Sequence, residues 1–240
     1  MINQYEGDNM QILTKSSLPL GGFAGLTEHR LVTDSRVFAG RKSPDTFEGI
    51  GNFVYLADAR FNPMGETHMH SHKEIDVITI MMDGRISHEG SLEHGQSLVA
   101  GETQVQRAGG EGFEHNEVNP DKAKNRLLQL WVLPDELGEP AAFKHYTLRQ
   151  GVTRIYGGSK KQTDTFYSST TIDIVRLSTG EVFNENSDVL IYVSKGNALV
   201  SSGDDNCEAD EGSLVRSNGI RIEAKNDIEV VVVTVVTRQV

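Results

Sequence analysis

Short runs of valine, isoleucine, leucine and threonine dominate this chain, and glycine, asparagine or aspartate interrupts them every few residues. Runs of this length are typical of β-strands, and the residues between them supply the tight and positive-φ positions that hairpins need. With 24 glycines and only 7% aromatic residues, the chain is predicted to be all-β. The expected strands are Phe53–Ala57, Asp76–Met82, Arg85–His88, Gln104–Ala108, Leu127–Val132, Thr171–Leu177, Val189–Val193, Ala198–Ser201, Gly219–Ala224 and Ile228–Val236.

The second half of the chain repeats features of the first half. The segment from Asp83 to His88 resembles Lys195 to Val200, and Val99–Val105 resembles Ala209–Val215. A repeat of roughly one hundred residues indicates a duplicated domain. Two prolines mark a crossover linker between the copies. We predict a first domain at 1–133, a linker at 134–147 and a second domain at 148–240.

Histidines are confined to the first copy, because all eight lie at or before position 145. His68, His70 and His72 alternate along the chain, as do His115 and Glu117. Alternate residues of a β-strand point to the same face. Three imidazoles and one carboxylate suit a single divalent first-row metal and leave coordination positions open to water, dioxygen or a substrate. The second copy has no histidine, so we expect it to be metal-free.

The histidine segments lie in motifs that resemble those of the pirin family, which belongs to the cupin superfamily. Residues 65–84, with Gly65, His70, His72 and Gly84, resemble the first cupin motif of pirins. Residues 100–117 are similar to the second motif, and the Leu-Gln-Leu-Trp-Val run at 128–132 is similar to the strand that closes the N-terminal pirin barrel. The resemblance covers Phe53 to Trp131, with a weaker match in architecture from Thr171 to Val236.

The resemblance implies a fold of two jelly-roll (cupin) β-barrels in tandem, with one mononuclear metal in the N-terminal barrel. Carried over position by position, the metal ligands are His70, His72, His115 and Glu117. His68 and His70 also form a His-x-His pair, but the number of residues from the pair to Asp76 and Gly84 matches the family pattern for His70 and His72. Around the metal we expect His68 near the mouth of the barrel, Asp76 in a supporting role and Gln104 in the pocket.

The resemblance also implies a function, an iron-dependent dioxygenase of the quercetin 2,3-dioxygenase type. Its partners would be dioxygen and a flavonol-like or other small enolic substrate, and Glu117 would be the base that takes the substrate's hydroxyl proton. Fe(II) is the expected metal, although the ligand set also accepts Mn, Co, Ni, Cu or Zn. The alternative is a regulatory protein without enzymatic activity, which acts through a protein partner and uses the metal as a structural or redox-sensing element.

Other features of the sequence exclude some classes of function. The formal net charge of −11 argues against direct binding of nucleic acid, which requires clustered lysine and arginine. We expect no membrane segment and a cytoplasmic protein, because no run has the length of a membrane span and the first residues lack the pattern of a secretion signal.

The remaining histidines are not expected to bind the metal, and two of them are predicted to be solvated in a hairpin loop: His88 and His94.

Overall fold

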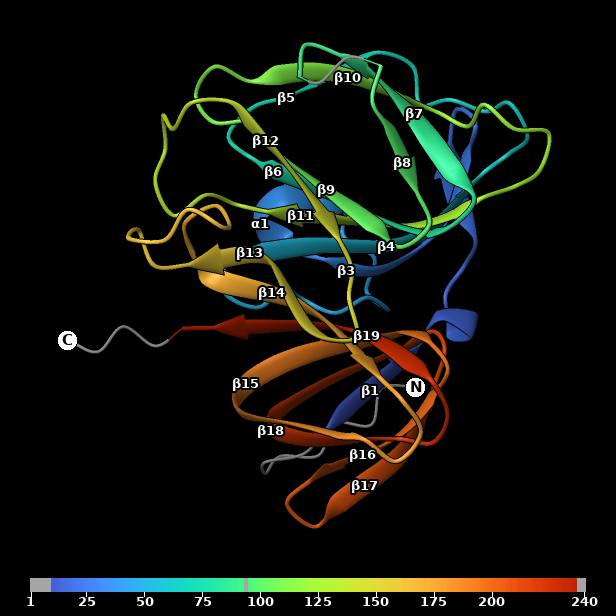
Figure 1. Ribbon diagram of the computed structural model, residues 1–240, viewed down its shortest axis with the longest axis vertical. Coiled ribbons are helices and arrows are strands. Elements are labelled where there is room, and N and C mark those ends of the chain that lie inside the picture. Colours follow the sequence, from blue (N-terminus) through green and yellow to red (C-terminus); the bar gives the residue numbers. More distant parts are fainter. Residues whose placement is uncertain (1–9, 93–94, 237–240) are drawn as a thin grey trace.

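The computed structural model describes residues 10–92 and 95–236, which form two β-barrels stacked one on the other (Figure 1). His94, which we expect in a hairpin loop, lies outside the described residues. The only α-helix in these residues is α1 (Ser35–Phe38), and two 3₁₀ turns, Lys15–Ser17 and Ala39–Arg41, lie near it in the sequence. The fold is therefore all-β, as predicted.

Two facing sheets form the first barrel. The larger sheet has seven strands in the order β12 (Ala142–Thr147), β9 (Glu102–Arg107), β6 (Asp76–Asp83), β11 (Arg126–Val132), β4 (Phe53–Phe61), β3 (Leu26–Thr33) and β2 (Gly21–Phe23). The smaller sheet has four strands in the order β5 (His70–His72), β10 (Phe113–Val118), β7 (Arg85–Gly90) and β8 (Ser97–Val99).

One eight-stranded sheet forms the second barrel. Its order is β13 (Gly151–Gly158), β14 (Ser168–Leu177), β19 (Ile228–Val235), β15 (Val182–Lys195), β18 (Ser213–Ala224), β16 (Asn197–Ser202) and β17 (Asp205–Asp210). The eighth strand, β1 (Gln11–Thr14), pairs with β18. The long apolar run near the C-terminus is β19, which lies between β14 and β15 and is a central strand.

Two segments pair with a sheet that their place in the sequence does not indicate. Strand β1 precedes the first barrel in sequence but joins the sheet of the second barrel, in register with Thr14 opposite Ser213. Strand β12 falls in the predicted linker, yet it pairs with β9 and completes the large sheet of the first barrel. Each of these two sheets is therefore extended by a segment that sequence order assigns elsewhere.

The large sheet of the first barrel is buried on both faces. Strand β4 has eight of its nine residues buried, a pattern typical of a sheet covered on both sides. Leu56, Ile78 and Leu130 point away from the first barrel and pack in one apolar cluster with residues of the second barrel, such as Ile174 and Val231. The residues that alternate with them face the interior of the first barrel, so these strands support the site from behind.

Two buried tyrosines also join the barrels. Tyr192 of the second barrel donates a hydrogen bond of 2.7 Å to Asp58, which in turn pairs with Arg126. Tyr156 donates a 2.6 Å bond to Asp76. Burial raises the pKa of both tyrosines above the ordinary range, so they stay protonated and act as donors.

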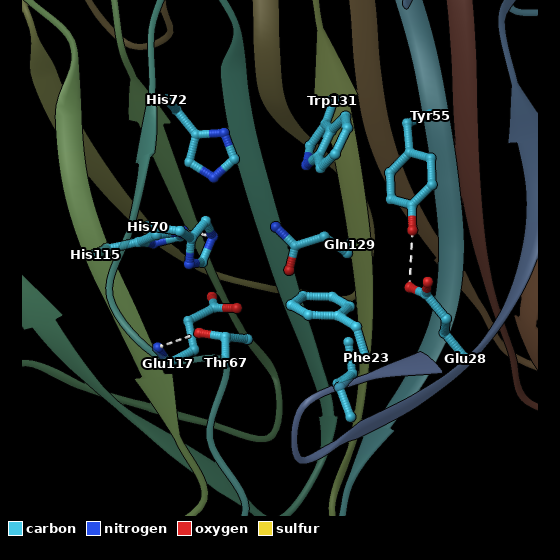
Figure 2. Close-up of a pocket in the computed structure, with 11 residues that line it drawn as sticks. Phe23, Glu28, Tyr55, Thr67, His70, His72, His115, Glu117, Gln129 and Trp131 are labelled. Carbon is cyan, nitrogen blue, oxygen red and sulfur yellow. Dashed lines mark hydrogen bonds between the residues drawn. The ribbon is translucent and has the colours of Figure 1, made fainter. Parts of the chain in front are cut away.

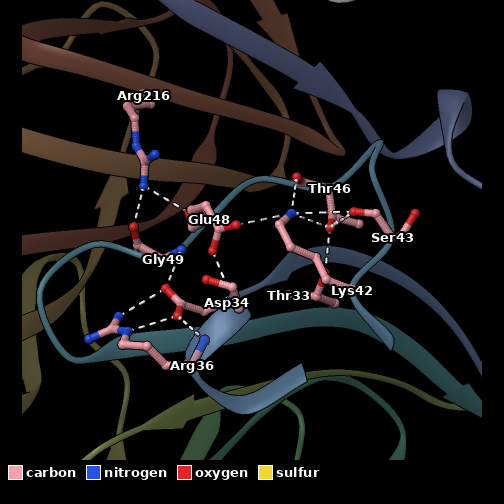
Figure 3. A network of polar contacts seen from close by, with 10 residues as sticks. Thr33, Asp34, Arg36, Lys42, Ser43, Thr46, Glu48, Gly49 and Arg216 are labelled. Atoms are coloured by element: carbon pink, nitrogen blue, oxygen red, sulfur yellow. Dashed lines mark hydrogen bonds and ion pairs between the residues drawn. The ribbon is translucent and has the colours of Figure 1, made fainter. Parts of the chain in front are cut away.

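A polar network beside α1 adds a further contact between the barrels (Figure 3). Asp34 caps the helix by accepting from the backbone N–H of Arg36, and it also accepts from the backbone N–H of Gly49. Arg216 of the second barrel donates to the backbone carbonyls of Glu48 and Gly49. The loop that follows α1 is thereby fixed to both barrels.

Candidate metal centre

The central strand of the small sheet, β10, brings together the residues of the candidate metal centre. His115 in β10 pairs directly with His70 in β5, and Phe113 pairs with His72. On the other side of β10, Glu117 pairs with His88 in β7. Since alternate residues share a face, His115 and Glu117 both enter the barrel interior, and strand register alone places the imidazoles side by side.

The ligand atoms of His70, His72 and His115 all lie within 4.8 Å of one another. His115 Nε2 is 3.0 Å from His70 Nε2. Two nitrogens bound at right angles to one ion, each at about 2.1 Å, would be separated by about 3.0 Å. The three histidines therefore fit one first-row metal ion.

Burial keeps the imidazoles of His72 and His115 neutral. The pKa of His72 is lowered to about 4, chiefly by burial and then by His70. The pKa of His115 is lowered to about 2 by burial and by the neighbouring histidines. Metal ligands must be deprotonated, so both rings are ready to bind a cation at neutral pH.

Glu117 lies beside the three histidines with its carboxylate held by two neighbours. Its Oε1 accepts from Thr79 Oγ1 at 2.9 Å and from Gln104 Nε2 at 3.3 Å. Burial raises the pKa of Glu117 to about 7, although both hydrogen bonds act to lower it. The carboxylate oxygens are not part of the close cluster of three nitrogens, so Glu117 is within the site but is held toward the opposite sheet.

Gln104 lies next to Glu117 but does not line the cavity, and two other predicted neighbours of the metal lie elsewhere. The His68 side chain is 71% exposed, with Nδ1 3.7 Å from Glu66 Oε1. The prediction that it points into the barrel is wrong, because β5 starts only at His70 and the positive φ of His68 breaks the alternation. Its carbonyl instead accepts from His70 Nδ1 at 2.9 Å.

Asp76 is the second departure. It shares a strand face with Ile78 and turns toward Tyr156 of the second barrel, away from Thr79 and the metal centre. The expected supporting role at the metal is therefore wrong. Since β6 is buried on both faces, a sequence pattern cannot show which face an isolated acidic residue takes.

His88 is the functional neighbour that sequence reasoning misses. We predict a solvated residue, yet its side chain is 1% exposed and its Nε2 lies 3.3 Å from His115 Nδ1. Strand β7 continues to Gly90 and pairs with β10. The sequence signal that could have indicated its burial is that His88 lies two residues after Ile86, which is fully buried, and so shares its face of the strand.

A small cavity opens in front of the histidines, with a volume of about 40 Å³ (Figure 2). Its far wall includes aromatic side chains, with the rings of Tyr55 and Trp131 4.4 Å apart. Trp131 Nε1 is buried and has no hydrogen-bond partner among the described residues. The lining residues are Phe23, Leu26, Glu28, Tyr55, Thr67, His70, His72, His115, Glu117, Gln129 and Trp131.

Comparison with known proteins identifies the family of this chain. The family model described as pirin matches residues 35–132. A Zymomonas mobilis protein named "Putative quercetin 2,3-dioxygenase" is 30% identical over 190 residues, which cover 73% of this chain and 79% of that protein. This chain belongs to the pirin family. The quercetin 2,3-dioxygenase of Escherichia coli K12 is 34% identical over 70 residues, covering 29% of this chain and 30% of the enzyme.

Solved structures show the same fold. The bacterial pirin YhhW of Escherichia coli in complex with nickel(II) superposes with a TM-score of 0.80 at 20% identity, covering 94% of this chain and 98% of that one. A quercetin 2,3-dioxygenase of Acinetobacter baumannii has a TM-score of 0.69 at 17% identity, covering 93% and 85%. This pirin thus has the predicted fold of two cupin β-barrels in tandem. Within residues 10–92 and 95–236, no helix is long and apolar enough to cross a membrane.

Proposed function

We propose that this pirin is a metal-dependent dioxygenase that acts on a flavonol-like or other small enolic substrate, with Fe(II) as the metal. The observation that carries the proposal is the combination of three clustered imidazoles with a carboxyl group of pKa about 7 in one cavity. The relatives named for quercetin 2,3-dioxygenase activity support the same reaction class. Glu117 is proposed as the fourth ligand to the metal.

When bound by His70, His72 and His115, the metal would supply a Lewis acid with open positions for the substrate's oxygen and for dioxygen. Glu117 would take the proton of the enolic hydroxyl. Burial raises the pKa of Glu117 to about 7 in the metal-free protein, and a bound divalent metal would lower it. Glu117 would therefore act as the base only while its carboxylate is bound weakly or transiently to the metal. Thr79 and Gln104 hold Oε1, so the direction of the carboxylate is set before the substrate arrives.

The cavity indicates how much of a substrate lies beside the metal. At about 10–15 Å³ for each enclosed water, a volume of about 40 Å³ holds about three waters or the oxygen-bearing end of a larger molecule. Phe23, which is 48% exposed and lines the cavity, is placed to contact the rest of that molecule. The buried N–H of Trp131 can donate to a substrate oxygen.

Metal analysis and oxygen uptake together test the proposal. Protein purified without added metal is analysed for metal content, loaded with Fe(II) under anaerobic conditions and mixed with quercetin in aerated buffer. We expect near-stoichiometric metal and oxygen uptake that His115→Ala abolishes. His145→Ala is the matched control, because this half-exposed histidine lies 3.3 Å from Glu102 and does not line the cavity. Stoichiometric metal without oxygen uptake from quercetin or a simple catechol would refute the dioxygenase and leave the metal site standing.

A further inference from the structure

The ring of His88 lies directly behind His115, on the side away from His70. The ring centroids of His88 and His115 are 5.4 Å apart. His115 therefore has a histidine at each ring nitrogen, with His70 Nε2 at 3.0 Å from Nε2 and His88 Nε2 at 3.3 Å from Nδ1. Only one of these two nitrogens can face the metal position, and it is Nε2.

Gln106 fixes His88 from the opposite sheet. Its side-chain nitrogen, which can only donate, lies 2.8 Å from His88 Nε2, and Gln106 is fully buried in β9. His88 Nε2 therefore carries a lone pair and no proton, and it shares this lone pair with the longer contact to His115 Nδ1 at 3.3 Å. The series His115, His88 and Gln106 thus crosses the barrel interior from the small sheet to the large sheet.

His70 and His115 are held by different means. His70 Nδ1 donates to the backbone carbonyl of His68, which fixes its ring with Nε2 toward the metal position. His115 lies in the middle of β10, between two paired strands, where the backbone groups serve the sheet. A side chain must therefore accept the Nδ1 proton of His115.

We infer that His88, held by Gln106, is a positioning residue for the metal ligand His115. With Nε2 of His115 on the metal, its Nδ1–H donates to His88 Nε2, which selects the tautomer that can coordinate. Without this acceptor, the proton can move to Nε2 and block the coordinating lone pair. The inference rests on the metal-binding part of the proposed function and is independent of the reaction.

The test uses full-length His88→Leu, which removes the acceptor, and His88→Gln, which restores one. His145→Leu is the control for loss of a histidine away from the cavity. Each protein is titrated with Ni(II) in competition with a chelator, and the thermal midpoint of the metal-free protein is recorded. Loss of a ligand's hydrogen-bond partner typically weakens metal binding 10–100-fold. We expect that loss in His88→Leu, partial recovery in His88→Gln and no change in His145→Leu.

Long-range ¹H–¹⁵N NMR of the metal-free wild type at neutral pH reads the tautomer directly and does not depend on whether a variant folds. A proton on Nδ1 of His115 supports the inference, and a proton on Nε2 overturns it. Native Ni(II) affinity in a folded His88→Leu protein also overturns it. If the wild type binds neither Ni(II) nor Zn(II), the proposed metal centre itself is refuted. If wild type and His88→Leu bind the metal equally, only the role of His88 is refuted.

Discussion

Replacing Glu117 by glutamine should stabilise the metal-free protein at high pH. The folded-state pKa of about 7 lies above the ordinary value of 4.5 because burial disfavours the charged form. The folded protein therefore keeps a proton that the unfolded chain releases, so this group lowers stability as the pH rises from 4.5 toward 7. Glutamine does not ionise and avoids the loss.

The pKa difference sets the magnitude of the effect. At about 1.4 kcal/mol for each pKa unit, ionising Glu117 in the folded protein costs about 3 kcal/mol at pH 8 and less than about 1 kcal/mol at pH 5. Glu117→Gln should thus gain roughly 2 kcal/mol on the wild type between these pH values. For a chain of this size, that corresponds to roughly 4–8 °C in the thermal midpoint.

The assay is thermal unfolding of wild type and Glu117→Gln in a chelator at pH 5 and pH 8. His72 and His115 also make stability depend on pH, since their lowered pKa values favour folding as the pH rises through 6.5. Their effect is common to both proteins and cancels in the difference. A difference between variant and wild type that is equal at both pH values would refute the reasoning that burial raises the pKa of Glu117.

Three further predictions concern the frame and mouth of the site. Tyr192→Phe removes the donor to buried Asp58 and should lower the free energy of unfolding by about 1 kcal/mol; an unchanged urea midpoint would contradict this. Gly90→Ala places a methyl group 2.1 Å from the Glu114 carbonyl oxygen, so it should separate β7 from β10 and reduce both the thermal midpoint and Ni(II) binding. The control is Gly40→Ala, which has open space around it and should change neither. Phe23→Ala should keep Ni(II) affinity and raise the KM for quercetin several-fold, and equal KM values would show that Phe23 does not contact the substrate.

Local pattern was sufficient to predict ten of the nineteen strands in the described residues, together with the close histidines. His70 and His72 alternate on one strand, and the spacing to His115 follows a recurrent motif, so the three rings were identified without knowing how the strands pair. The strand ends shifted, as in β4, which continues to Phe61. Pairing decides those ends, and pairing is not local.

The errors arose where burial on both faces removes the alternating signal. Asp76 and Thr79 are both fully buried, yet Asp76 faces the second barrel and Thr79 faces Glu117. His88 was misjudged because the glycine and acidic residues after it resemble an exposed hairpin. Glu28 and Phe23 reach the cavity from a hairpin about fifty residues before the histidines, a contact that only the closed barrel creates.

The second barrel contributes to the site without supplying any of its lining. All eleven residues around the cavity precede Pro134, while the outer faces of β4, β6 and β11 are covered by the second barrel. On their inner faces the same strands carry Tyr55, Thr79 and Gln129. A sheet with an exposed apolar outer face would not hold these side chains in fixed positions in water. The second barrel, which has no histidines, thus supports the site in the first barrel. It buries the outer face of the large sheet, whose inner face holds the carboxylate of Glu117.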